Sequence, residues 1–82
     1  MRSRGSAIII NDNHVALIKR IKKEEIYYVF PGGGIESGET SKEATIREAY
    51  EELGVDIIVK DLFDTHYYKG KQYFYLSEVI GG

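Results

Sequence analysis

The sequence predicts a small α+β domain in which a mixed β-sheet packs against one helix. Short segments rich in β-branched and aromatic residues fill most of the chain, and one run, residues 40–53, has apolar residues at helical spacing. The 82 residues suffice for a single domain, residues 1–82, and a hydrophobic content of 43% is typical of a folded protein. We expect the element order ββ(β)αβββ.

Three strands are predicted before the helix. Residues 6–10 (SAIII) and 15–20 (VALIKR) flank the turn sequence NDNH, which predicts a β-hairpin. Residues 21–25 (IKKEE) are charged and predict a solvated loop. Residues 26–30 (IYYVF) predict the third strand, which stops at Pro31 because proline lacks a backbone N–H for further pairing.

The helix is predicted to begin at Thr40 and to end at Leu53. Thr40 and Glu43 have the spacing of a capping box, and Gly54 is the expected C′ residue. One strand and a second hairpin around Lys69 and Gly70 should follow, at residues 55–59, 65–68 and 71–80.

Charge and composition exclude several classes of protein. A net charge of −2 offers no general attraction to a nucleic acid polymer, and the absence of cysteine rules out disulfides and thiolate metal sites. No apolar run approaches the roughly 18 residues that span a bilayer. We expect a cytoplasmic protein that does not enter the membrane.

Two opposite faces are predicted for the helix. One arc is apolar and is expected to face the core: Ile46, Ala49, Tyr50 and Leu53. The opposite arc is acidic: Glu48, Glu51 and Glu52.

The acidic arc has a solvated helix face as its simplest interpretation. Like charges at i, i+3 and i, i+4 repel, however, and the C-terminal turns of a helix disfavour anions. Clustered carboxylates suit a hard divalent cation, so Mg²⁺ or Mn²⁺ is the expected cofactor.

Arg47 and the glycines before the helix each allow two interpretations. Arg47 is either a surface ion pair with Glu43 and Glu51 or the group that orients a carboxylate beside the metal. Residues 32–34 (GGG) either permit a tight turn after the proline or bring backbone close to a ligand. Neither a P-loop nor a GxGxxG motif is present.

Loop and helix together resemble the Nudix family. The residues Gly33, Glu39, Arg47-Glu48-Ala49, Glu51-Glu52 and Gly54-Val55 match every position of the Nudix box, G-x5-E-x7-R-E-U-x-E-E-x-G-U. The resemblance implies an αβα sandwich whose second helix this chain lacks, so the chain is expected to be a truncated Nudix domain.

The resemblance also implies an activity and roles for residues. It implies metal-dependent hydrolysis of a pyrophosphate bond in a nucleoside diphosphate linked to another moiety. Glu48, Glu51 and Glu52 would be metal ligands near the Gly33 carbonyl, with Glu48 or Glu52 taking a proton from water. Arg47 belongs to the catalytic group as the partner of Glu39, with which it would brace the loop, and Gly54 is structural.

Substrate residues and assembly follow less directly. Arg20, Tyr28, Phe30 and Tyr75 are candidates for phosphate contact or base stacking, although ordinary strand packing is the alternative for the aromatic residues. No role is assigned to His14 or His66. One sheet face, including Tyr73 or Tyr75, should lack cover, which favours a homo-oligomer that exchanges residues 71–80.

Two other functions stay open. The chain could be a catalytically silent nucleotide-binding module, which a shortened C-terminus favours, or an interaction fragment that docks through its uncovered sheet face. The intact acidic arc favours the enzyme.

Overall fold

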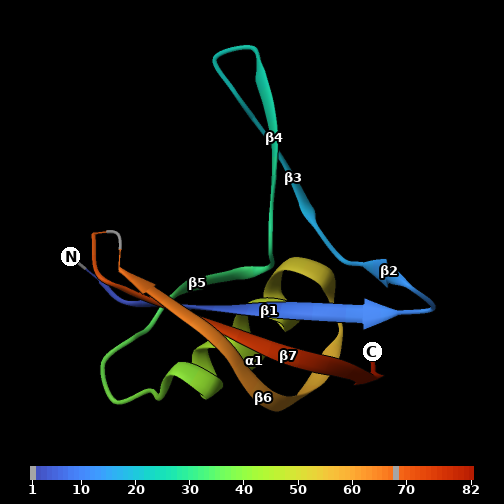
Figure 1. The fold of residues 1–82 in the computed structure, drawn as a ribbon, viewed down its shortest axis with the longest axis vertical. Helices are drawn as coiled ribbons and strands as arrows, with labels where there is room; N and C mark the ends of the chain where they lie inside the picture. The colour runs from blue at the N-terminus through green and yellow to red at the C-terminus, as the bar shows by residue number, and fades with distance from the viewer. Residues whose placement is uncertain (1, 68) are drawn as a thin grey trace.

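The computed structural model describes residues 2–67 and 69–82 and contains a mixed sheet, one helix and a projecting hairpin (Figure 1). In chain order the elements are β1 (Arg4–Asn11), β2 (His14–Val15), β3 (Ile18–Lys22), β4 (Glu25–Val29), β5 (Gly32–Gly34), α1 (Ser41–Leu53), β6 (Asp56–Tyr67) and β7 (Lys71–Gly81). The predicted α+β class, with a mixed sheet packed on one helix, is confirmed.

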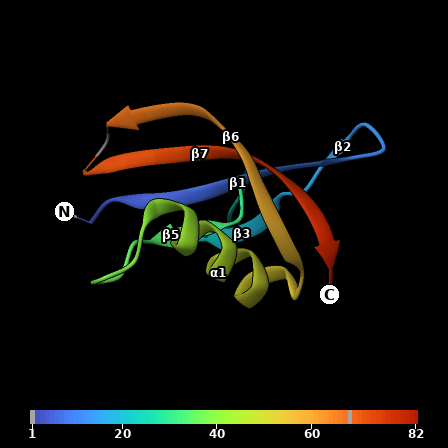
Figure 2. The same cartoon turned by 90° about the horizontal axis from the view of Figure 1, so that it is seen from below.

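The larger sheet is organised around β1. On one edge β1 runs parallel to β7, and β6 continues the sheet antiparallel to β7. On its other edge β1 pairs antiparallel with β5 near its start and with β2 near its end. Helix α1 covers one face of this sheet (Figure 2). Strands β3 and β4 form a separate two-stranded sheet.

Small residues bring the helix close to β1. The core contains Ala7, Ile9, Ala49 and Ile57. A Cβ at Gly5 would overlap the Thr45 hydroxyl, so the strand and helix backbones approach closely at this point.

This close approach corrects the predicted core face of the helix. Ala49 is buried as expected, but Ile46 and Leu53 are partly exposed and Tyr50 is 59% exposed. The helix packs through its smallest side chains instead, Ala44, Thr45 and Ala49, because a larger residue would not fit against Gly5. The periodicity of the sequence therefore predicted the apolar stripe of the helix. The short distance between the helix and β1 buries the neighbouring face, which carries the small side chains, instead.

The predicted hairpin of residues 6–10 and 15–20 is only partly right. Its turn forms, but the second strand stops after Val15 and resumes at Ile18, where it pairs with β4 instead of β1. The predicted loop at residues 21–25 is wrong, since only Lys23 and Glu24 make the turn. Their φ values of 48° and 68° are those of a tight hairpin turn. Such a turn usually carries Asn-Gly, so the Lys-Glu pair did not predict it.

Two further boundaries differ from the prediction. Gly32–Gly34, expected in a loop, pairs with β1 as strand β5. The strands expected at residues 55–59 and 65–68 are one edge strand, β6, which β-bulges bend along its length, and Tyr68 lies outside the described residues. An edge strand accommodates the charged side chains within residues 60–64.

The ends of the helix agree with the prediction. Thr40 Oγ1 accepts the Glu43 N–H and the Glu43 carboxylate accepts the Thr40 N–H, at 3.1 and 2.8 Å. Gly54 adopts the left-handed conformation, with φ 69°, and donates its N–H to the Tyr50 carbonyl.

Tyr75 does not lie on the uncovered face as expected. It is buried against the helix, and its hydroxyl forms a hydrogen bond with that of Ser41. In the described part of the chain no helix has the length and apolar character needed to cross a membrane.

Candidate functional site

Arg47 ties helix α1 to the loop that precedes it. Its Nε and Nη2 donate to the two carboxylate oxygens of Glu39 at 2.8 and 3.0 Å, in the fork geometry that suits a guanidinium. Nη2 also donates to the Gly34 carbonyl at 3.1 Å. One side chain of the helix therefore holds both the last residue of β5, Gly34, and the loop that connects β5 to the helix.

The same guanidinium contacts two glutamates of the acidic arc. Nη1 of Arg47 donates to Oε1 of Glu48 at 2.9 Å and to Oε1 of Glu51 at 2.7 Å. Arg47 thus offsets the repulsion between these carboxylates. Among the described residues, none donates a hydrogen bond to the second oxygen of Glu48 or Glu51.

This network changes the acid–base properties of its members. The Arg47 fork, helped by the Glu36 backbone N–H, lowers the pKa of Glu39 from 4.5 to about 2. The hydrogen bonds to Glu39 and Glu51 raise the pKa of Arg47 above its already high value. Both groups stay charged throughout the neutral pH range.

Glu48 packs directly against the glycine segment that forms strand β5 and leads into the loop before the helix. A Cβ added to Gly33 would overlap the Glu48 carboxylate. The missing side chain of Gly33 is therefore what lets this carboxylate lie beside the loop backbone.

Glu52 joins three parts of the molecule. Its Oε1 accepts the Gly32 N–H at 2.8 Å, and its Oε2 accepts Nη2 of Arg20 at 2.9 Å. Strand β5, the helix and strand β3 meet at this one carboxylate, whose side chain is 18% exposed.

The donor chemistry of this region fits a hard divalent cation. Glu48 and Glu52 both lie against backbone of Gly32 or Gly33, and their carboxylate oxygens are the kind of ligand that such a cation prefers. The three glutamates do not converge, however: across residues 2–67 and 69–82 no cluster of three His, Asp or Glu side chains has the spacing of a metal site. Nη1 of Arg47 holds Glu48 and Glu51, whereas Arg20 and the Gly32 N–H hold Glu52.

A family comparison decides how this arrangement is classified. The model of the NUDIX domain matches residues 1–80. The chain belongs to the Nudix family. The match extends well beyond the Nudix box itself and includes all but the last residue of the strands described above.

Curated Nudix relatives differ in the substrates that their names give. The chain is 38% identical over 55 residues to an 8-oxo-dGTP diphosphatase of Proteus vulgaris, covering 65% of this chain and 49% of the relative. It is 42% identical over 60 residues to an ADP-ribose pyrophosphatase of Methanocaldococcus jannaschii, covering 72% of this chain and 36% of the relative. An RNA pyrophosphohydrolase of Rickettsia canadensis is 42% identical over 52 residues, covering 63% and 32%.

Solved Nudix structures share the fold. A Nudix hydrolase from Nitrosomonas europaea superposes with a TM-score of 0.88 at 22% identity, covering 98% of this chain and 60% of that one. An ADP-ribose pyrophosphatase from Streptococcus suis gives 0.82 at 19% identity, covering 99% and 62%. The chain thus spans roughly a third to a half of these curated relatives and about three fifths of the two structures.

The predicted substrate residues separate in the structure. Tyr28 and Phe30 line a cavity of about 310 Å³ on the sheet face opposite the Nudix helix, together with Arg4, Ser6, Val29, Gln72 and Phe74. Arg20 is not among the lining residues and contacts Glu52, and Tyr75 faces the helix.

Sequence reasoning missed several groups at the glutamate site and at the cavity. These are the Gly32 N–H that holds Glu52, the Gly34 carbonyl that accepts from Arg47, and the lining residues Arg4, Gln72 and Phe74. Strand alternation places Arg4 and Phe74 on their faces, but the pairing of β1 with β7 that unites them is not readable from the sequence.

Proposed function

We propose that this chain hydrolyses a pyrophosphate bond in a nucleoside diphosphate linked to another moiety, with Mg²⁺ or Mn²⁺ as cofactor. The observation that carries the proposal is the Arg47 network, which fixes Glu48 beside the glycine loop. The diphosphatase and pyrophosphatase names of the relatives support this class of bond. The chain spans only part of those relatives. The activity is therefore a proposal both for this chain and for the whole protein.

The cation would be held by Glu48, Glu51 and Glu52 with the Gly33 carbonyl. When bound, it neutralises charge on the phosphate oxygens and lowers the pKa of a water molecule. Arg47 positions Glu48 and Glu51, and the Gly32 N–H positions Glu52. Glu48 or Glu52 accepts the proton of the attacking water.

Two groups of residues are proposed to contact the substrate. Tyr28 and Phe30 offer aromatic surface for a base at the cavity that they line, and Arg20, which lies beside Glu52, is the candidate for a phosphate contact. We propose a homo-oligomer acting in the cytoplasm, where such nucleotides are available.

Phosphate release from a panel of substrates tests the activity. The panel contains nucleoside triphosphates, ADP-ribose and 5′-triphosphorylated RNA, each assayed with and without Mg²⁺. We expect Mg²⁺-dependent turnover that Glu48→Gln abolishes while the melting temperature is kept, because glutamine has nearly the same size and its amide oxygen can still accept from Arg47. Glu78→Gln, on an exposed carboxylate of β7, is the matched control.

A nucleotide-binding module without catalysis is the second candidate. Each of the three glutamates has an arginine partner, Glu48 and Glu51 through Arg47 and Glu52 through Arg20, so these side chains are held in place without a cation. Nucleotide binding measured by calorimetry without Mg²⁺, together with no turnover in its presence, would favour this candidate.

A further inference from the structure

The hairpin of β3 and β4 is weakly attached to the rest of the fold. Its two strands pair only with each other, and it projects away from the larger sheet (Figure 1). A two-stranded hairpin alone is marginally stable in water. Its apolar side chains do little to anchor it, since Ile21 is 69% and Ile26 is 58% exposed.

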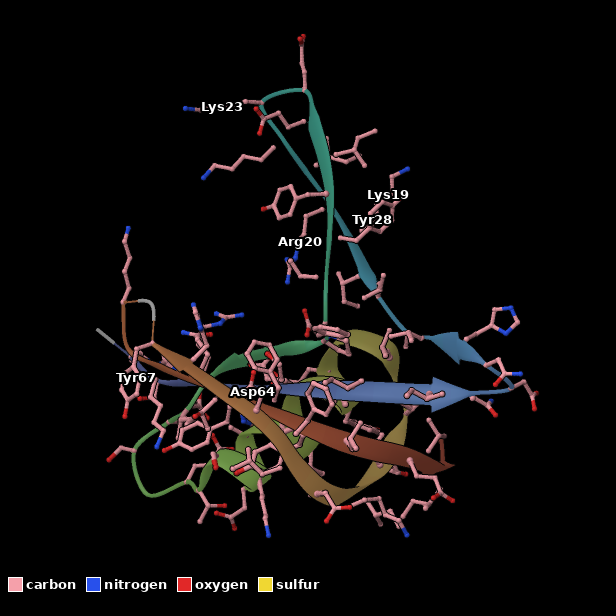
Figure 3. The ribbon with its side chains drawn as sticks, viewed as in Figure 1. Lys19, Arg20, Lys23, Tyr28, Asp64 and Tyr67 are labelled. Atoms are coloured by element: carbon pink, nitrogen blue, oxygen red, sulfur yellow. The ribbon has the colours of Figure 1, made fainter. Side chains whose placement is uncertain are left out.

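Arg20 connects this hairpin to the helix. Its guanidinium donates to Glu52, whereas the adjacent Lys19 extends from the other side of the strand (Figure 3). Within residues 2–67 and 69–82, the Arg20–Glu52 contact is the ion pair that bridges the hairpin and α1. This ion pair therefore holds the hairpin to α1, in addition to the contacts near the cavity where Tyr28 and Val29 of β4 meet the larger sheet.

Both oxygens of that carboxylate are already in use. The Gly32 N–H holds Oε1, and it cannot move away because Gly32 belongs to β5 and is paired with Ser6. Arg20 holds Oε2 from the end of a long side chain that is 45% exposed. A divalent cation on Glu52 would lie within a few ångströms of this guanidinium, where like charges repel strongly. Of the two groups on Glu52, Arg20 is the one able to leave.

We propose that Arg20 is a positioning residue that competes with the divalent cation for Glu52. Without the cation, Arg20 holds both the Glu52 carboxylate and the hairpin in place. Cation binding at Glu52 displaces Arg20 and releases the hairpin from α1. This inference rests on the metal site of the proposed function and adds to it a coupling between that site and the projecting hairpin.

Mn²⁺ affinity, measured by water proton relaxation without substrate, tests the competition. Arg20→Gln should bind Mn²⁺ about three- to tenfold more tightly than the unsubstituted chain, because the competing charge is gone. Lys19→Gln is the matched control: it removes the same charge one residue away without breaking an ion pair, and should change the affinity less than about twofold. The gain must disappear in Arg20→Gln/Glu52→Gln.

Different outcomes of this experiment would reject the competition by Arg20 and the metal site of the proposed function. If Arg20→Gln binds Mn²⁺ equally or more weakly while Glu52→Gln abolishes binding, the metal site stands and the competition is wrong. If neither the unsubstituted chain nor Arg20→Gln binds Mn²⁺, the metal site and the inference both fail. An equal gain in Lys19→Gln would reduce the effect to general charge and overturn the role of Arg20.

Backbone ¹⁵N relaxation of the hairpin supplies a readout independent of affinity. Saturating Mg²⁺ should lower the order parameters of the amides in β3 and β4, and Arg20→Gln should show the lowered values without any cation. The amides of β1 and β7 should not change. Hairpin order parameters that Mg²⁺ leaves unaltered would overturn the release.

Discussion

At the scale of single residues, Arg47 organises the site. Its planar guanidinium reaches Glu39, Glu48, Glu51 and the Gly34 carbonyl at once, which a lysine ammonium has too few fixed donors to do. Gly33 contributes because it has no side chain: Glu48 occupies the space that a side chain at this position would need.

The Glu39–Arg47 pair predicts a pH dependence of stability. Because folding lowers the pKa of Glu39 from 4.5 to about 2, the pair stabilises the fold above pH 4.5 and this contribution is lost as the pH falls through 2. The melting temperature of Glu39→Gln should therefore lie below that of the unsubstituted chain at neutral pH and converge with it near pH 2. Glu78→Gln controls for general loss of charge, and a constant difference across the titration would contradict the assignment.

Gly33→Ala should damage the site although the substitution adds only one methyl group. The added Cβ displaces the Glu48 carboxylate, and we expect kcat/KM to fall about 10- to 100-fold. Gly34→Ala is the control, because its Cβ meets only the flexible end of Arg2, which can move. Equal activity of the two variants would show that Glu48 tolerates displacement.

At the scale of elements, helix α1 is defined by its ends. Thr40 and Glu43 satisfy backbone donors at the first turn, and Gly54 closes the last turn. The helix then packs through small residues against β1, so its register on the sheet sets where the acidic side chains meet the glycine loop.

Loss of the N-terminal cap should destabilise the fold without changing the site chemistry. Thr40→Ala removes the acceptor of the Glu43 N–H and should lower the free energy of unfolding by about 1 kcal/mol in chemical denaturation. Ser37→Ala, at an exposed position of the preceding loop, should change it by less than about 0.5 kcal/mol. Equal effects would mean that the cap contributes nothing measurable.

At the scale of the whole molecule, apolar surface is left uncovered. Beyond the hairpin, Leu62 is 51% and Phe63 is 64% exposed on the edge strand β6. Strand β7, expected to exchange between copies, pairs on both edges within its own chain. Exchange would thus have to rebuild both pairings with a partner.

We expect these 82 residues to self-associate. Several hundred Å² of exposed apolar surface forgoes about 5 to 10 kcal/mol of burial energy, comparable to the total stability of a small domain. Sedimentation velocity at low micromolar concentration should show a dimer or larger species. A compact monomer with a cooperative melt would contradict this expectation.

The sequence by itself determined the features that depend on neighbouring residues. The spacing of Gly33, Glu39 and Arg47 identified the family, and the helix ends at Thr40 and Gly54 were predictable because capping acts within one turn. The strand cores at residues 6–10, 26–30 and 71–80 were likewise readable from β-branched and aromatic residues.

Only the tertiary structure decided which groups meet across the chain. Arg20 contacts a glutamate 32 positions away, and Tyr75 faces the helix instead of the open side of the sheet. Such contacts depend on which strands pair and how closely the helix approaches β1, and these follow from packing the whole chain at once. Local propensity carries no information about a partner that only long-range pairing brings within reach.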